Sequence, residues 1–103
     1  MRSFQRGAVR LHVLHHSARE PVHGTWLMTE LRKHGHDVSP GTLYPILHSM
    51  EAHGLITSEH SVVDGRRLRR YVITGEGRAA LEEAKIMLGH LCHELLGHPS
   101  PPN

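Results

Sequence analysis

The segment from Ser39 to Leu55, SPGTLYPILHSMEAHGL, constrains the fold of this chain most strongly. Ser39 is a preferred helix-capping residue, and Pro40 suits the first helical position, where its missing N–H is not needed. Gly54 is suited to a left-handed C-cap, so the segment predicts a helix over residues 39–53. Apolar residues then define one buried face at helical spacing. They are Leu43, Ile46, Leu47 and Met50.

The opposite face of this helix is polar and almost uncharged. The hydroxyl groups on it can donate to phosphate oxygens, and the ring of Tyr44 can also contact a thymine methyl. In helix-turn-helix proteins the first turns of the recognition helix lie nearest the DNA. For Tyr44, a half-buried ring with a solvated hydroxyl is the alternative. The predicted DNA contacts on the helix are Ser39, Thr42, Tyr44 and His48.

A hairpin rich in arginine is predicted directly after this helix. Residues 55–60 and 68–74 are typical of strands, and Asp64-Gly65 is typical of the turn between them. Arginine forks bind phosphates through two hydrogen bonds, whereas the alternative is a charged edge that prevents sheet aggregation. Strand alternation would place Arg70 on the face opposite Arg69. The predicted DNA contacts of this wing are Arg66, Arg67, Arg69 and Arg70.

Two helices are predicted before this segment and one after it. The first covers residues 4–18, with Ala8, Leu11 and Leu14 facing the core and Val13 and Ala18 as further candidates. The second covers residues 24–34. Thr74 is predicted to cap the last helix. The order indicates a mainly α fold with a small β-hairpin, a winged helix-turn-helix with a long C-terminal dimerisation helix. We expect a DNA-binding domain over residues 1–74, the dimerisation helix over residues 75–97 and a disordered tail over residues 98–103.

The last helix carries apolar residues in a heptad pattern. Such a seam can pack on its own domain or on a partner chain. A small winged helix has little surface to cover a helix of roughly 34 Å, so we favour a homodimer. The predicted interface residues are Leu81, Ala84, Leu88, Leu91 and Leu95.

Several of these motifs together resemble the PadR family of transcriptional regulators. They are the run Ser39–Pro45, His23-Gly24, Gly65-Arg66-Arg67 and Thr74-x-x-Gly77-Arg78-x-x-Leu81. The resemblance covers about residues 6–96 and implies a winged helix-turn-helix whose C-terminal helix carries the dimer. It also implies a cytoplasmic repressor that binds a pseudo-palindromic operator in double-stranded DNA and is released by an unidentified signal. The C-terminal helix lacks the tryptophan of the family's ligand-binding members, so we expect Trp26 to serve packing.

The composition agrees with this class of protein. The net charge is +2 with histidine neutral and the pI is about 9.1, with arginines gathered in the wing. The single cysteine, Cys92, excludes an internal disulfide and fits a reducing compartment. We find no phosphate-binding loop, no HExxH and no recognisable nucleophile, and therefore expect no enzyme. No segment has the length and hydrophobicity of a membrane span or a signal peptide.

Twelve histidines in 103 residues are the unusual feature of the composition. Pairs spaced by three or four residues on a helix can chelate a transition metal, and cysteine with histidine suits zinc or copper. Surface histidines without a ligand are the commoner explanation, so we expect no obligatory cofactor. The alternative functions are a metal- or haem-responsive binding protein and a protein–protein adaptor. The candidate ligands are His12, His15, His16, His90, Cys92 and His93.

Overall fold

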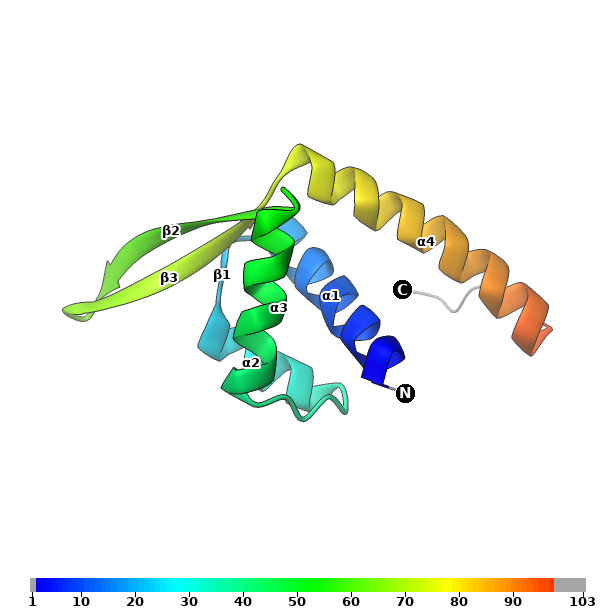
Figure 1. Ribbon diagram of the computed structural model, residues 1–103, viewed down its shortest axis with the longest axis horizontal. Helices are drawn as coiled ribbons and strands as arrows, with labels where there is room; N and C mark the ends of the chain where they lie inside the picture. The colour runs from blue at the N-terminus through cyan, green and yellow to red at the C-terminus, as the bar shows by residue number, and fades with distance from the viewer. Residues whose placement is uncertain (1, 98–103) are drawn as a thin grey trace.

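The computed structural model describes residues 2–97, so the predicted tail over residues 98–103 lies outside the described residues. The order of elements confirms the predicted fold class (Figure 1). The elements are α1 (Arg2–Arg19), β1 (Val22–His23), α2 (Gly24–Lys33), α3 (Pro40–Ala52), β2 (Ile56–Val63), β3 (Arg66–Ile73) and α4 (Gly75–Leu96).

The three strands form one antiparallel sheet in the order β1-β3-β2. The two-residue strand β1 was not predicted, because two residues are too short to show alternation; it pairs Val22 with Tyr71 and His23 with Arg70. Strands β2 and β3 extend further toward the turn than predicted. Asp64 and Gly65 form that turn with φ values of 52° and 75°, as a two-residue type I′ turn requires. The hairpin projects away from the helices (Figure 1).

The core lies between α1, α2, α3 and the base of the sheet. On α1 the predicted core face was partly wrong, because Val9 is buried while Ala8 and Leu11 are only partly covered; Leu14 and the further candidate Val13 are buried as predicted. The helix has two apolar sides, and Ala8 and Leu11 line a trough between α1 and α4. The fully buried side chains are Val13, Leu27, Leu31, Leu43, Leu47, Met50 and Ile56.

The start of α3 differs from the prediction in one detail. Ser39 makes no side-chain cap; its hydroxyl instead donates to the Thr42 hydroxyl at 3.3 Å. The backbone carbonyl of Ser39 accepts hydrogen bonds from the Thr42 and Leu43 amides at 3.0 and 2.9 Å. Gly54 has the predicted left-handed conformation, with φ of 77°. The predicted ends of this helix are therefore confirmed to within a residue.

Thr74 joins α4 to the end of α3. Its hydroxyl accepts a hydrogen bond from the Gly77 amide at 3.0 Å, the predicted cap, and donates to the Gly54 carbonyl at 2.6 Å. A Cβ at Gly77 would lie 2.1 Å from the carbonyl oxygen of Leu55, so α4 can approach this junction closely only with glycine there. The direction of α4 is thereby fixed relative to α3.

Candidate nucleic-acid interface

Helix α3 presents the predicted polar face to solvent. Ser39, Tyr44 and His48 are exposed and Thr42 is half-buried, whereas the apolar side of the helix is packed in the core. The carboxylate of Glu51 accepts hydrogen bonds from the Ser58 amide and hydroxyl at 3.1 and 2.7 Å. This contact ties the C-terminal turn of α3 to β2 and so positions the wing relative to the exposed face.

Tyr44 packs on the first residue of α2. A Cβ at Gly24 would lie 2.6 Å from the Tyr44 hydroxyl oxygen and 2.9 Å from two ring carbons. Tyr44 as a whole keeps 39% of its surface exposed, so one side of the residue packs on Gly24 while the rest is open to solvent. Next to it, the Nδ1 of His23 bonds to the Arg69 carbonyl at 3.2 Å. The His23-Gly24 pair thus holds α2 against both α3 and the wing.

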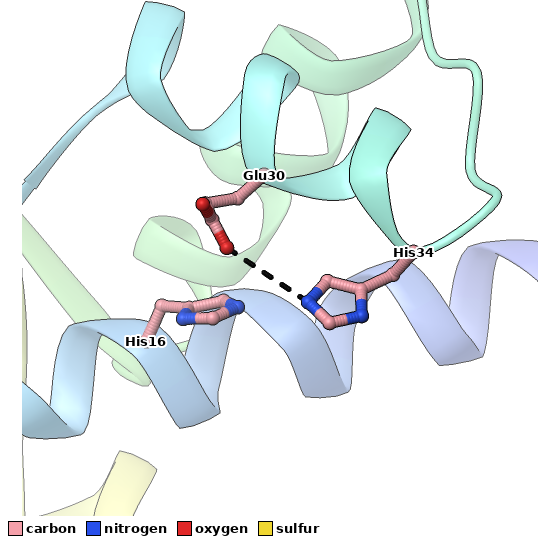
Figure 2. A group of neighbouring side chains, drawn as sticks. All are labelled: His16, Glu30 and His34. Carbon is pink, nitrogen blue, oxygen red and sulfur yellow. Dashed lines mark ion pairs between the residues drawn. The ribbon is translucent and has the colours of Figure 1, made fainter.

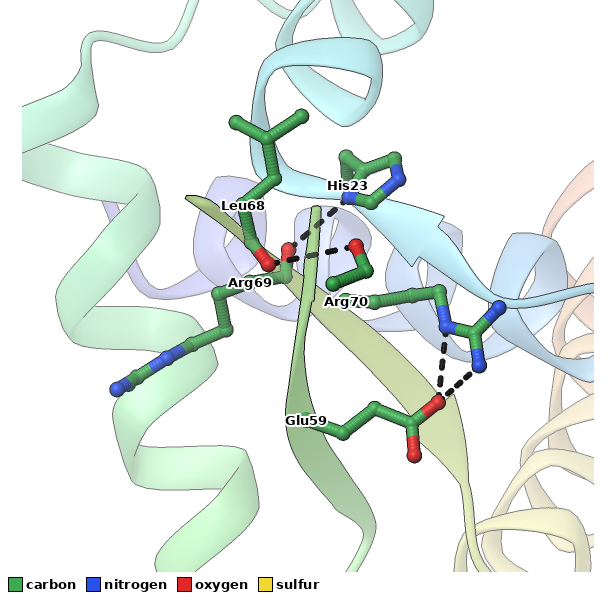
Figure 3. Close-up of polar contacts among 6 residues, drawn as sticks. His23, Glu59, Leu68, Arg69 and Arg70 are labelled. Carbon is green, nitrogen blue, oxygen red and sulfur yellow. Dashed lines mark hydrogen bonds and ion pairs between the residues drawn. The ribbon is translucent and has the colours of Figure 1, made fainter. Parts of the chain in front are cut away.

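The four wing arginines are not equivalent. Glu59 binds Arg70, accepting from its Nε at 2.9 Å and also from its Nη2 (Figure 3). Within the described part of the chain, no acidic side chain forms an ion pair with Arg66, Arg67 or Arg69, and all three are exposed. These three arginines are therefore better placed than Arg70 to receive a phosphate.

Arg69 lies on the face of β3 that also carries Tyr71. Burial raises the pKa of the Tyr71 phenol, while the nearby Arg69 guanidinium opposes that rise and Tyr44 and Glu51 add to it. These four side chains thus come together at the junction of β3 and α3. Arg69 is itself exposed, so an exposed arginine of the wing lies near the end of β3 that meets α3.

Most of the heptad seam of α4 is exposed in the part of the chain that the structure describes. Leu81 is only 7% exposed and belongs to the core of its own domain, so the predicted interface role of Leu81 has a competing explanation. Leu88, Leu91 and Leu95 are 46%, 45% and 71% exposed. An apolar trough of about 540 Å³ lies between α1 and α4, and Leu88 is part of its lining.

His12 and His16 of α1 lie beside histidines at and after the end of α2, and no metal-ligand group among the described residues includes His90, Cys92 or His93. Potential ligand atoms of His16, Glu30 and His34 all lie within 4.8 Å of one another. Among the described residues this is the only group of three or more such side chains. The sequence prediction missed Glu30 and His34, although their spacing of four residues at the end of one predicted helix was a usable signal.

The neighbouring rings affect one another's protonation. Burial lowers the pKa of His12 and of His16, and repulsion from other histidines, His36 for His12 and His15 for His16, lowers them further. The ring centroids of His12 and His36 are 4.9 Å apart. Trp26 stands edge-on to His16 at 5.3 Å but is 41% exposed, so in the single chain it is not part of the core. The two α1 histidines are therefore mainly neutral at pH 7.

Three packed helices, an arginine-bearing hairpin and an exposed polar third helix define a winged helix-turn-helix protein. The sequence model of the Transcriptional regulator PadR-like family matches residues 13–83. The chain belongs to this PadR-like family of transcriptional regulators, a role that implies DNA binding. Of the helices that the structure describes, none is long and apolar enough to cross a membrane.

Individual relatives agree with this assignment. The chain is 59% identical over 100 residues to the transcriptional regulator Rv3488 of Mycobacterium tuberculosis, covering 97% of this chain and 94% of that protein. A PadR-like regulator from Bacillus cereus superposes with a TM-score of 0.84 at 31% identity, covering 92% and 94% of the two chains. A PadR family regulator from Eggerthella lenta superposes with a TM-score of 0.79 at 31% identity, covering 90% and 82%.

Proposed function

We propose that the chain is a repressor that binds a pseudo-palindromic operator as a homodimer. The observation that carries the proposal is the exposed polar face of α3, followed by a wing whose Arg66, Arg67 and Arg69 are exposed and have no acidic partner among the described residues. Helix α3 would enter the major groove, with Thr42 and Tyr44 contacting phosphates or base edges. Arg66, Arg67 and Arg69 would contact the flanking backbone or minor groove.

The homodimer would form through α4. Leu88, Leu91 and Leu95 are exposed at heptad spacing, and pairing two such helices removes this apolar surface from water. The Thr74–Gly77 junction would hold each α3 in a fixed orientation relative to the dimer axis. Two successive major grooves on one DNA face lie about 34–36 Å apart, which sets the separation required of the two α3 helices.

Footprinting on the chain's own upstream region tests this proposal. We expect protection of two half-sites whose centres lie about 10 base pairs, or a multiple of one turn, apart. Inserting about 5 base pairs between them places the half-sites on opposite faces of the duplex and should abolish dimer binding, whereas a full-turn insertion should be less damaging. Equal affinity for all three spacings would contradict a rigid dimer.

Repression and release need a separate measurement in cells. A reporter fused to the footprinted region should be more active when the regulator is deleted, and the proposal places the regulator in the cytoplasm with its operator. Unchanged or decreased reporter activity in the deletion strain would contradict repression. Release from the operator would follow when an effector binds and favours a dimer arrangement that does not fit the DNA.

A further inference from the structure

His16, Glu30 and His34 converge from two helices that meet at one end of the domain. Figure 2 shows His16 on α1 directed toward Glu30 of α2 and toward His34, the residue that ends α2. The His34 Nε2 and Glu30 Oε2 atoms are 3.8 Å apart. Two imidazole nitrogens and one carboxylate oxygen thus share a region in which their ligand atoms lie within 4.8 Å of one another.

We propose that these three side chains form a binding site for a divalent transition metal ion, with Zn²⁺ as the preferred ion. Two histidines and one glutamate are a donor set found in zinc sites that keep a fourth position for water. Tetrahedral zinc with bonds of about 2.0–2.1 Å needs ligand atoms roughly 3.3 Å apart, so the three side chains must approach one another by up to about 1.5 Å.

The neighbouring residues leave room for the three side chains to approach one another. The His34 side chain is 53% exposed, so its ring can rotate toward His16 without disturbing the core. The two carboxylate oxygens of Glu30 have different partners. Oε1 contacts Lys33 Nζ at 3.1 Å, and Oε2 faces His34. The hydrogen bond from Lys33 holds the pKa of Glu30 below its usual value, which keeps the carboxylate ionised.

A metal at this site would connect α1 to the C-terminal end of α2. Residues 34–39 lead directly from this end to α3. Fixing that turn would affect where α3 begins, and this consequence for operator binding rests on the proposed function. Metal binding itself requires no DNA, so it can be tested and rejected independently.

Calorimetric titration of the metal-free full chain with Zn²⁺ is the first test. We expect saturation at one ion per chain. His16→Ala and His34→Ala should each weaken binding by more than the roughly 10- to 100-fold that loss of an outer-shell partner costs, and Glu30→Gln should also weaken it. His60→Ala is the matched control, because His60 is an exposed histidine of β2 outside the cluster, and it should bind as the wild type does. Circular dichroism confirms that each variant is folded.

The absorption spectrum of bound Co²⁺ supplies a second test. Its readout would not change if these residues only stabilised the fold. In His34→Cys, Co²⁺ bound at this position should show a thiolate-to-cobalt charge-transfer band that is absent from the wild type. The absence of saturable zinc binding, or wild-type affinity in folded His16→Ala and His34→Ala, would overturn the proposal. Loss of binding only in the His90→Ala/His93→Ala double variant would also overturn it and assign the ion to α4.

Discussion

Arg69 and Arg70 are adjacent in β3, yet their side chains lie on opposite faces of the sheet and have different partners. Arg70 forms an ion pair with Glu59 of β2 (Figure 3). Arg69 lies on the side of Tyr71 and α3, with no acidic partner in the described part of the chain. Two neighbouring arginines of one wing therefore make a matched pair for testing which face binds DNA.

Arg69→Ala should weaken DNA binding more than Arg70→Ala does. The removal of one phosphate-binding side chain per subunit should affect specific and non-specific sequences alike, because such side chains position the protein without selecting bases. Arg70→Ala removes an exposed ion pair whose contribution to stability is about 0–1 kcal/mol, so both variants should remain folded. Fluorescence anisotropy with a labelled duplex measures the two affinities. An equal decrease in both variants would show that the wing does not bind through the Arg69 face alone.

Replacement of Leu88 or Leu91 by Asp should dissociate the proposed dimer. Each substitution puts an ionised group into an apolar seam, where removing its hydration is costly. The variants should sediment as monomers, and operator affinity should fall steeply because two half-sites no longer bind together. Glu83→Ala, at an exposed position of α4, is the control and should leave the assembly unchanged. A wild-type chain that sediments as a folded monomer would contradict the proposed assembly.

The contact between Gly24 and Tyr44 can be measured with a double-mutant cycle. In the wild type, Gly24→Ala places a methyl group 2.6–2.9 Å from the Tyr44 ring and should destabilise the fold by roughly 1–3 kcal/mol, as overpacking does. In a Tyr44→Ala background the same change should cost much less, because the ring is absent. Chemical denaturation gives the four free energies of unfolding. Additive effects of the two substitutions would disprove the contact.

Gly77→Ala should be among the most damaging single substitutions in the chain. Its Cβ would lie 2.1 Å from the Leu55 carbonyl oxygen and 2.7 Å from Ile73, so the start of α4 would have to move. Gly75→Ala is a close control, because a Cβ at that position meets nothing within 4 Å. Thermal unfolding should show a large fall in Tm for Gly77→Ala and little change for Gly75→Ala. Similar Tm values for the two variants would contradict the packing of α4 at Leu55.

Local sequence signals were sufficient for most of the fold. Pro40 and Gly54 marked the ends of α3, and Asp64-Gly65 marked the turn, because these residues determine the conformation of their own backbone. Strand β1 was missed, since a two-residue strand exists only through its pairing with β3. The face of α1 was partly misassigned, because periodicity cannot tell which of two apolar sides faces the core.

In the candidate sites, too, some features could be predicted from local sequence and others could not. The exposure of Tyr44 and of the wing arginines followed from helical and strand periodicity. The pairing of Arg70 with Glu59 and the meeting of His16 with Glu30 and His34 depend on contacts between separate elements. Spacing along the chain groups residues of one helix, so it directed attention to His12, His15 and His16. It did not point to Glu30 of α2 or to His34 at its C-cap.

The salt dependence of DNA affinity tests the central claim most directly. The logarithm of the association constant should fall linearly with the logarithm of salt concentration, with a slope of about −0.9 for each phosphate that the protein neutralises. For the chain's own upstream region, a variant with Arg66, Arg67 and Arg69 all replaced by Ala should bind more weakly and show a shallower slope, by up to about 0.9 for each phosphate that is no longer neutralised. An unchanged affinity and slope in this variant would contradict a DNA-binding surface built from α3 and the wing.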